Sequence, residues 1–472
     1  ETSGKNAIIV TALADRDQAV RDLVRSAFGH NGQKCSAASL AICEAEVYDD
    51  PAFRRQLRDA AASLAVGSAW EAASRVTPLT QPPGSALRRA LTTLDPGEEW
   101  LLEPRPLHRE AALWSPGIKL GVQRGSFFHR TECFGPVLGL MRAADLAEAI
   151  ALANDQPFGL TSGIQSLDDR EVARWLEAID AGNLYVNRLI TGAIVGRQPF
   201  GGWKASSVGP GAKAGGPNYV LQLCRPSLLK PAPEAPDVAM RLAKVAYERA
   251  WREHFSQAHE PIRLLGERNV FRYRPCRRIL LRGEAATAAG RLALDQALLA
   301  ARVCGAPVTV SLAAGAPPTF SLIPRRGSGP LTPPSPQGAE GEDRAHEPSP
   351  LGGTREPSPL WGAAQEPSPL RGEGRVRGDD DASPRVETEA ELITRLAAGG
   401  FERLRALVPV SAELRAAAQA AGVTMIDAPV LAAGRLELRH YLREQTVSHV
   451  MHRYGSVFEP LTLPSPQRGE GD

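Results

Sequence analysis

The stretch Phe28-Gly-His-Asn-Gly-Gln-Lys-Cys35-Ser-Ala37 places a cysteine directly after a turn that contains two glycines. A helix is expected before this turn, over about 16–28, because Asp15 can cap its first turn and apolar residues recur on one face. An apolar strand is expected after it, through 40–43. Backbone N–H groups of a tight turn can stabilise both a thiolate and an oxyanion. Cys35 is therefore a candidate nucleophile, and the alternative is a buried structural thiol, as most free cysteines are.

The bulk composition is that of an ordinary protein with sizeable cores. The chain has 472 residues, of which 43% are hydrophobic and 23% are charged, enough for roughly two or three domains. The formal net charge of +2 favours neither nucleic acid nor an anionic membrane as a partner, and no nucleic-acid site is visible. No apolar run approaches the ~20 residues that a membrane-spanning helix needs. A small-molecule substrate is the expected partner.

The cysteines and histidines predict no metal site. The cysteines are scattered and form no Cys-x-x-Cys pair: Cys35, Cys43, Cys133, Cys224, Cys276 and Cys304. This spacing argues against a zinc site or a disulfide framework, and it favours a reducing, cytoplasmic location. His449 and His452 lack a third ligand nearby and are weak evidence for a metal.

Strands that alternate with helices predict an α/β protein with two domains. The first ends in a Gly-rich stretch, and the second, smaller α/β domain is interrupted by an insert rich in Pro, Gly, Ser and Glu that should be disordered. Near-identical repeats in the insert and the tail resemble repetitive DNA read in frame; a Pro-rich ligand for a partner domain is the alternative. The expected ranges are 1–224 for the first domain, 225–262 for a linker and helix, 263–312 and 386–456 for the second domain, 313–385 for the insert and 457–472 for a disordered tail.

Glu1 is the candidate general base. A thioester formed on a cysteine needs an activated water to release the product, and a carboxylate in an apolar pocket can activate it. Glu1 lies 34 residues before Cys35, in the segment Glu1-Thr-Ser-Gly-Lys5. A lone glutamate would otherwise be interpreted as solvated surface.

Three motifs, in this order, resemble those of the aldehyde dehydrogenase superfamily. Residues 1–5 are similar to its E-x-G-G-K base motif, with Ser3 in place of a glycine, and residues 28–35 to its F-x-x-x-G-Q-x-C nucleophile motif. Glu132-Cys-Phe-Gly-Pro136, which starts 97 residues after Cys35, is similar to E-x-F-G-P. The resemblance implies an aldehyde dehydrogenase catalytic domain, followed here by a smaller aldehyde-dehydrogenase-like domain without a nucleophile motif.

The same resemblance implies the roles of the site residues. Cys35 would be the nucleophile and Glu1 the base, while Glu132 and Phe134 would hold NAD at its nicotinamide end. Residues 187–193, 197–202 and 213–217 resemble the glutamate semialdehyde (1-pyrroline-5-carboxylate) dehydrogenase branch, and more closely the dehydrogenase part of bifunctional proline utilisation A (PutA) proteins. There the backbone N–H groups of a loop bind the substrate carboxylate. The substrate-binding residues implied here are Ser36, Gly192, Ala193, Phe200 and Phe28.

The implied reaction is the NAD-dependent oxidation of L-glutamate γ-semialdehyde to L-glutamate, the second step of proline catabolism. Two alternatives remain: a dehydrogenase for another carboxylate-bearing semialdehyde, or a non-catalytic scaffold fragment. FAD would be required only if a proline dehydrogenase domain preceded this region in the parent protein. A homo-oligomer could form.

The chain begins at Glu1 without a methionine and enters a strand pattern at Ala7, so we expect an N-terminally truncated fragment that lacks most of the NAD-binding half. Because only part of the cofactor site is then present, this chain alone should show little or no dehydrogenase activity. Formation of NADH with glutamate semialdehyde as substrate measures this directly, and robust turnover would contradict the expectation.

Overall fold

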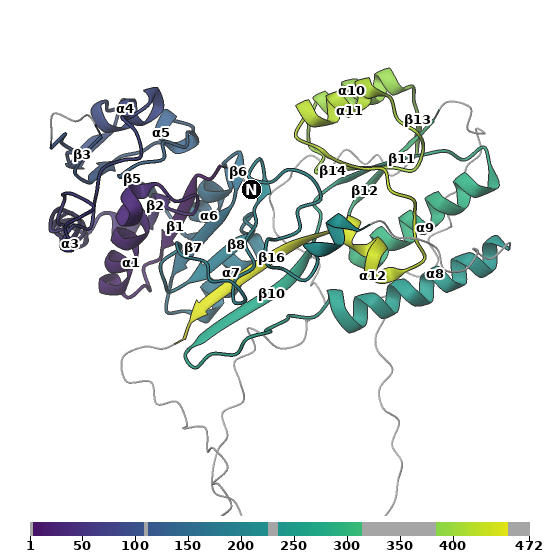
Figure 1. Cartoon of the computed structure of the whole chain (residues 1–472), viewed down its shortest axis with the longest axis horizontal. Helices are drawn as coiled ribbons and strands as arrows, with labels where there is room; N and C mark the ends of the chain where they lie inside the picture. The colour runs from purple at the N-terminus through teal and green to yellow at the C-terminus, as the bar shows by residue number, and fades with distance from the viewer. Residues whose placement is uncertain (1–2, 108–111, 225–234, 314–383, 452–472) are drawn as a thin grey trace, which may run out of the picture.

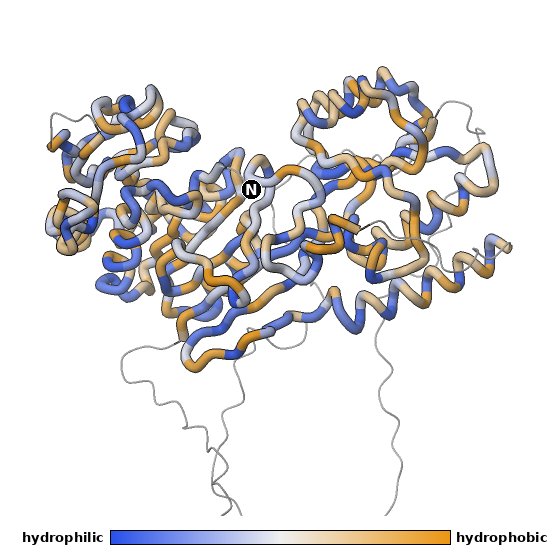
Figure 2. The backbone as a smooth tube through the Cα atoms, viewed as in Figure 1, coloured by the Kyte–Doolittle hydropathy of each residue, from blue (hydrophilic) through white to orange (hydrophobic). Residues whose placement is uncertain are grey.

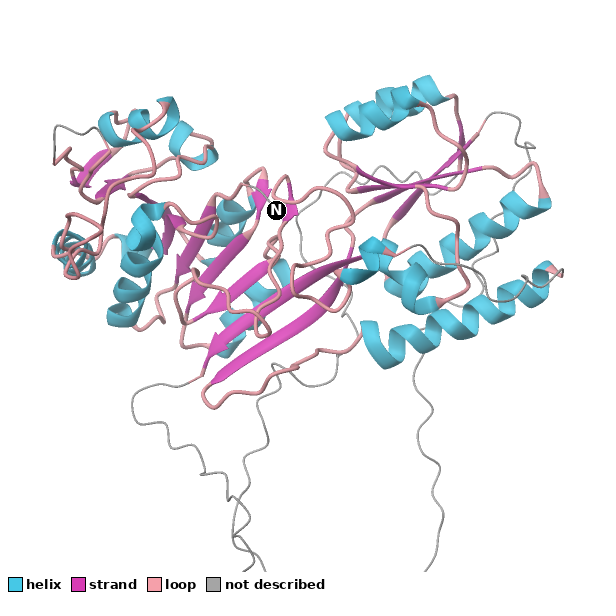
Figure 3. Cartoon of the chain, in the orientation of Figure 1, coloured by secondary structure: helices cyan, strands magenta, loops and turns pink. Residues whose placement is uncertain are grey.

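The fold is α/β, as the sequence predicts, with a large central sheet and a smaller sheet beside it (Figure 3). The computed structural model describes residues 3–107, 112–224, 235–313 and 384–451. Glu1, the tail over 457–472 and nearly all of the insert over 313–385 lie outside the described residues. The predictions made for them stay predictions.

The central sheet has nine strands in the order β10-β16-β8-β7-β1-β2-β5-β4-β3. Neighbours are parallel except at the two edges, where β10 pairs with β16 and β3 with β4 in antiparallel fashion. The strands are β1 (Asn6–Val10), β2 (Ala38–Glu44), β3 (Glu99–Leu102), β4 (Gly117–Leu120), β5 (Val137–Ala143), β7 (Thr161–Gln165), β8 (Asn183–Val186), β10 (Glu267–Pro275) and β16 (Leu442–Val450).

Helices cover both faces of this sheet, and the strand β1 at its centre is apolar from Ala7 to Val10. On β1, Ile8 and Val10 pack in the core that contains α1 and α3, whereas Ala7 and Ile9 pack in the core that contains α6 and α7. The helical segments are α1 (Arg16–Phe28), η1 (Gly29–Gly32), α2 (Ala45–Tyr48), α3 (Pro51–Ala62), α4 (Ser85–Thr92), α5 (Phe127–Arg130), α6 (Leu146–Asn154), α7 (Asp169–Ala178) and η2 (Val220–Leu223), and a two-stranded ribbon pairs β6 (Phe158–Gly159) with β9 (Trp203–Lys204).

The second unit has a parallel five-stranded sheet in the order β13-β12-β11-β14-β15. Its helices α8 and α10 alternate hydrophilic and hydrophobic positions along their length, as expected for helices with one buried face (Figure 2). Its elements are α8 (Pro236–Ala250), η3 (Trp251–Phe255), β11 (Ile279–Gly283), α9 (Ala288–Cys304), β12 (Val308–Leu312), β13 (Arg385–Val386), α10 (Glu389–Ala397), β14 (Arg403–Ala406), α11 (Ala412–Ala420), β15 (Thr424–Ile426), α12 (Gly434–Glu437) and η5 (Leu438–Tyr441).

Two strands from the second half of the chain complete the central sheet. Figure 1 shows β10 and β16 running side by side from the second unit to the edge of the central sheet, where β16 lies parallel to β8. Both strands fall in the ranges 263–312 and 386–456, which the sequence assigns to the second domain. Their buried positions include Glu444, Gln445 and Thr446. Strands with so many buried polar residues do not show the apolar pattern of a central-sheet strand.

A buried ion pair lies in the core of the second unit. Arg405 on β14 and Glu437 on α12 are 1% and 0% exposed, and their charged groups are 3.2 Å apart. Glu437 also accepts hydrogen bonds from the Tyr441 hydroxyl (3.1 Å) and the Leu431 backbone N–H (3.0 Å). Removing one partner would leave an uncompensated buried charge.

Substitution of Arg405 by methionine should therefore lower the free energy of unfolding by about 3–5 kcal/mol. The matched control is Arg415→Met, because the ion pair of Arg415 with Asp427 is half-exposed (52% and 50%) and should contribute no more than about 1 kcal/mol. Urea denaturation of the two variants measures the difference, and equal losses would contradict this account of the buried pair.

Candidate active site

Cys35 lies exposed in the turn between η1 and β2. The Lys34 carbonyl accepts a hydrogen bond from the Ala37 N–H (2.9 Å), which closes a turn with Cys35 and Ser36 at its centre. Ser36 is buried beside it. The alternative of a buried structural thiol therefore does not describe Cys35. It does describe four other cysteines, namely Cys43, Cys133, Cys276 and Cys304, which are buried.

Left-handed backbone shapes the turn before the cysteine. His30, Asn31 and Gly32 have consecutive φ values of 55°, 58° and 66°, a region that asparagine and glycine tolerate best. The Asn31 side chain fixes the turn, because it accepts from the Thr77 N–H (2.6 Å) and donates to the Pro78 carbonyl (3.0 Å). A Cβ on Gly32 would lie 2.2 Å from the Gly135 carbonyl oxygen. The nucleophile turn thus packs directly on the Glu132–Pro136 segment.

The segment that follows Glu1 runs past the backbone of Cys35. The Asn6 side-chain amide donates to the carbonyls of Cys35 (2.8 Å) and Ala37 (2.9 Å). A Cβ on Gly4 would lie 2.8 Å from the Cys35 carbonyl oxygen, so only glycine fits at this position without a shift. Glu1 itself lies outside the described residues. Asn6 is a positioning residue that the motif comparison missed, because it follows the matched residues.

The two predicted cofactor residues lie next to the nucleophile turn. Glu132 accepts a hydrogen bond from the Gly4 N–H (2.9 Å), and the Phe134 carbonyl accepts one from the Gln33 side chain (3.3 Å). Phe134 is 43% exposed and lines an open hollow of about 290 Å³ together with Gln33 and Cys133. A carboxylate that can accept from ribose hydroxyls and an exposed aromatic ring beside a hollow fit the nicotinamide riboside end of a dinucleotide.

Lys5 places a buried amine beside these groups. It is 4% exposed, its Nζ donates to the Ser39 hydroxyl (2.6 Å), and it lies 3.9 Å from the centre of the Phe128 ring. Burial lowers the pKa of Lys5 to about 8, although the nearby Cys133 and Glu132 act in the opposite direction. The motif comparison includes Lys5 but assigns it no role.

The predicted substrate residues occupy different environments. Gly192 is exposed with φ 82°, and Ala193 is half-buried in the same loop. Phe200 is half-buried and exchanges two backbone hydrogen bonds with Ala214 (3.0 and 2.9 Å). Phe28 is fully buried in the core against the central sheet. Its side chain has no exposed surface, and its predicted contact with substrate stays a prediction.

The strand β8 leads into this loop. Burial raises the pKa of Tyr185 to about 12, and the charges of Arg188 and Cys35 both act on it. The Arg188 guanidinium carbon lies 5.5 Å from the centre of the Tyr185 ring, so Tyr185 is close to the segment that leads into the loop over 191–198.

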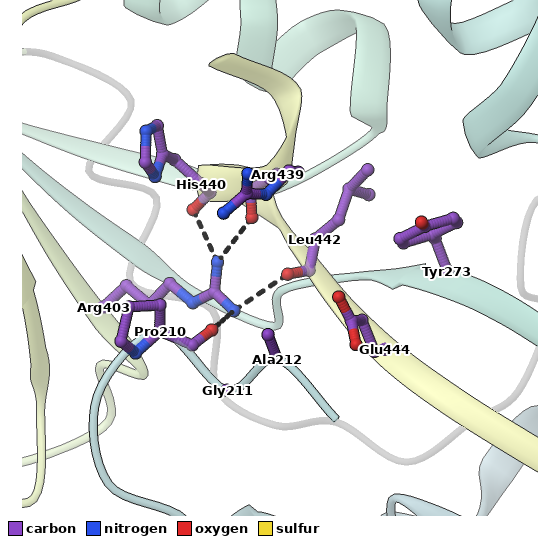
Figure 4. A pocket seen from close by; sticks show the side chains of 9 residues that line it. All are labelled: Pro210, Gly211, Ala212, Tyr273, Arg403, Arg439, His440, Leu442 and Glu444. Atoms are coloured by element: carbon purple, nitrogen blue, oxygen red, sulfur yellow. Dashed lines mark hydrogen bonds between the residues drawn. The ribbon is translucent and has the colours of Figure 1, made fainter. Parts of the chain in front are cut away.

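Residues from the second half of the chain form hydrogen bonds with the Gly-rich segment over 209–218. Glu444 on β16 accepts from the Lys213 N–H and from the Asn218 side chain, both at 2.8 Å, and burial raises its pKa. Figure 4 shows Arg403, from β14, donating to the Pro210 carbonyl (3.3 Å) and to the carbonyl of Leu442 (2.8 Å) on β16. The sequence offers no local signal for the contacts with the Gly-rich segment, because these partners lie between 193 and 231 positions apart.

Two further findings concern metals and membranes. Within the described ranges, no group of three or more His, Cys, Asp or Glu residues is arranged to hold a metal ion. No helix in the described part of the chain is both long and apolar enough to cross a bilayer.

Comparison with known proteins identifies the family. Residues 1–229 match the model of the aldehyde dehydrogenase family. This part of the chain belongs to the aldehyde dehydrogenase family. The resemblance inferred from the three motifs is thereby confirmed. The cysteine turn, Gly4 and Glu132 all lie within the matched residues.

Curated relatives are named 1-pyrroline-5-carboxylate dehydrogenase. The one from Bacillus cytotoxicus is 36% identical over 223 residues, which are 47% of this chain and 42% of that protein. The one from Geobacillus kaustophilus is 34% identical over 227 residues, with the same shares of the two chains. This chain therefore spans about two fifths of the length of these relatives.

A solved structure extends the likeness to the second unit. Proline utilization A (PutA) from Corynebacterium freiburgense is 39% identical and superposes with a TM-score of 0.72, covering 96% of this chain and 39% of that one. The family model ends at residue 229, whereas this comparison also includes the five-stranded sheet. The α/β architecture of both units is thus shared with a PutA protein.

Two glycines of the same turn provide a matched test of the site. Substitution of Gly32 by alanine should destabilise the fold by about 2 kcal/mol or more and slow alkylation of Cys35, because the new Cβ meets Gly135 in a left-handed conformation. Gly29→Ala should be tolerated, since φ at Gly29 is −56° and a Cβ there meets nothing within 4 Å. Thermal unfolding and the rate of Cys35 labelling by iodoacetamide measure both effects. An equal response of the two variants would contradict the close packing at Gly32.

Proposed function

We propose that the protein to which this chain belongs oxidises L-glutamate γ-semialdehyde to L-glutamate with NAD⁺. The observation that carries the proposal is the convergence of three segments on one exposed cysteine. The Asn6 side chain donates a hydrogen bond to the Cys35 carbonyl, and the Gly4 N–H donates one to Glu132. The family of residues 1–229 supports aldehyde oxidation, and the names of the curated relatives support this substrate.

The chemistry assigned to the chain uses a covalent intermediate. The Cys35 thiolate attacks the aldehyde carbon to give a thiohemiacetal, whose oxyanion is stabilised by the backbone N–H of Cys35. NAD⁺, when bound, supplies the hydride acceptor. Glu1 then activates a water that hydrolyses the resulting thioester and releases the Cys35 thiolate. Aldehyde, water and NAD⁺ are thereby converted to carboxylate, NADH and two protons.

The remaining site residues would bind and orient the cofactor and the substrate. Glu132 would accept hydrogen bonds from the nicotinamide ribose, with Phe134 packed beside the ring. Ser36 and the N–H groups of Gly192 and Ala193 would take the substrate α-carboxylate, which amides and a hydroxyl can bind without a buried countercharge. The proposed setting is the cytoplasm, with small molecules as the only required partners.

The second candidate keeps the enzyme class and changes the substrate to another carboxylate-bearing semialdehyde. A comparison of kcat/KM for glutamate and succinate semialdehydes separates the two. A scaffold role without chemistry is disfavoured by the exposure of Cys35 in a preformed turn. Failure of Cys35 to react with an aldehyde-mimicking electrophile would favour that role.

Substitution of Cys35 by alanine, in the protein that combines this chain with its NAD-binding residues, should lower kcat by roughly a thousandfold or more, because the nucleophile is lost. Cys224→Ala is the matched control, since Cys224 is the other exposed cysteine and should leave turnover unchanged. The rate of NADH formation measures both variants. Retained turnover in the Cys35 variant would rule out the assignment.

A further inference from the structure

The loop over 191–198 cannot be held in place by hydrophobic packing. Val195 is 93% exposed and Ile194 is 44% exposed. Gly192 and Gly196 have left-handed φ values of 82° and 81°, and a Cβ on Gly192 would meet nothing within 4 Å. A loop of this kind stays flexible unless polar contacts restrain it.

Gln198 supplies such a restraint from inside the protein. Its side-chain oxygen accepts a hydrogen bond from the Ile194 N–H (2.8 Å), and the Ile194 carbonyl accepts from the N–H groups of Arg197 (3.1 Å) and Gln198 (3.0 Å). The loop is therefore closed by one side chain that is itself only 4% exposed. Because Gly192 and Ala193 directly precede Ile194, the position of Ile194 sets theirs.

Strands from the second half of the chain fix Gln198 in turn. Its side-chain nitrogen lies 2.8 Å from Asn269 Oδ1, 3.0 Å from Ser448 Oγ and 3.0 Å from Glu267 Oε1. Arg188 donates to the same Ser448 hydroxyl (2.6 Å) and forms an ion pair with Glu267 (2.8 Å). The charge of the Glu267 carboxylate is thereby balanced by Arg188. The polar groups around Gln198 therefore carry no net negative charge next to the loop.

We infer that Gln198 is a positioning residue which, held by Ser448 on β16 and by Asn269 and Glu267 on β10, presets the loop that receives the substrate carboxylate. The inference rests on the function proposed above and adds the source of its specificity. Backbone N–H groups bind an anion well only when they are preorganised, since otherwise binding must order the loop. The second half of the chain therefore sets the preference for carboxylate-bearing aldehydes over neutral ones without touching the substrate.

The test uses the full chain and L-glutamate, the proposed product, as the probe. Alkylation of Cys35 by iodoacetamide is followed by mass spectrometry at increasing glutamate concentration. Glutamate should protect wild-type Cys35. Gln198→Ala should raise the half-protecting concentration about tenfold, as expected for loss of about one net hydrogen bond, with no change in the alkylation rate without ligand. Protection by butanal, a neutral aldehyde, should be the same in both proteins.

Gln445→Ala is the matched control. Gln445 is buried on the same strand as Ser448, but its amide donates to the Ala181 carbonyl (2.9 Å) rather than to the loop. Its variant should keep wild-type protection by glutamate. Equal shifts in the Gln198 and Gln445 variants, or an equal loss of protection by butanal, would overturn the inference and indicate general disruption.

Two further measurements keep the outcomes distinct. Ser448→Ala removes one acceptor of Gln198 and should shift glutamate protection in the same direction by a smaller factor, which decides the matter if the Gln198 variant does not fold. Hydrogen exchange at the Ile194 amide should accelerate in the Gln198 variant, independently of any ligand. If exchange at the Ile194 amide is faster in the Gln198 variant but glutamate does not protect wild-type Cys35, the proposed function and the carboxylate role are wrong. If glutamate protects wild-type Cys35 but exchange in the variant is unchanged, only the positioning role is wrong.

Discussion

The candidate site depends on a close approach of backbones that only glycine permits. Gly4 lies against the Cys35 carbonyl, and Gly32 lies against Gly135, in each case with no room for a side chain. These two contacts bring together the segments that contain the proposed base, the proposed nucleophile and the proposed cofactor-binding carboxylate. Because backbone groups make the contacts, the geometry of the site is as rigid as the strand and turns that hold them.

The same constraint explains why a long piece of chain is needed to support a small site. Cys35 leads into β2, which lies beside β1 in the middle of the sheet, so its position is fixed by packing on both faces. The loop over 191–198 has no such support. It lies beyond β8, where the sheet of the first unit would end if β16 did not add to it. Because β16 pairs with β8, this position lies inside the sheet and not at its edge. The buried polar residues of β10 and β16 then lie close enough to hydrogen-bond to Gln198 in the loop.

Local signals in the sequence were sufficient for the elements on either side of Cys35. The predicted helix over 16–28 is α1, with Asp15 accepting from the Gln18 N–H as its cap, and the predicted strand through 40–43 falls within β2. The joining of β10 and β16 to the first sheet was not predictable in this way. Many of their buried positions are polar and form hydrogen bonds with partners far away in the sequence: Ser448 contacts Gln198 across 250 positions. The role of Phe28 was inferred from a motif, whereas its burial follows from helix geometry that the motif does not encode.

The second unit contributes structure to the site and no reactive group of its own among the described residues. Burial raises the pKa of Cys276 to about 12 and raises that of Cys304 well above its usual value, so neither thiol is available as a thiolate near neutral pH. The second half of the chain contacts the first unit through β10 and β16, which contain buried, hydrogen-bonded polar residues, and through the Arg403 guanidinium. Such networks are costly when only partly satisfied, and they therefore specify one arrangement sharply. Buried polar groups of one unit can in this way help to fix a segment of its neighbour, because Glu267, Asn269 and Ser448 all accept hydrogen bonds from the Gln198 side chain.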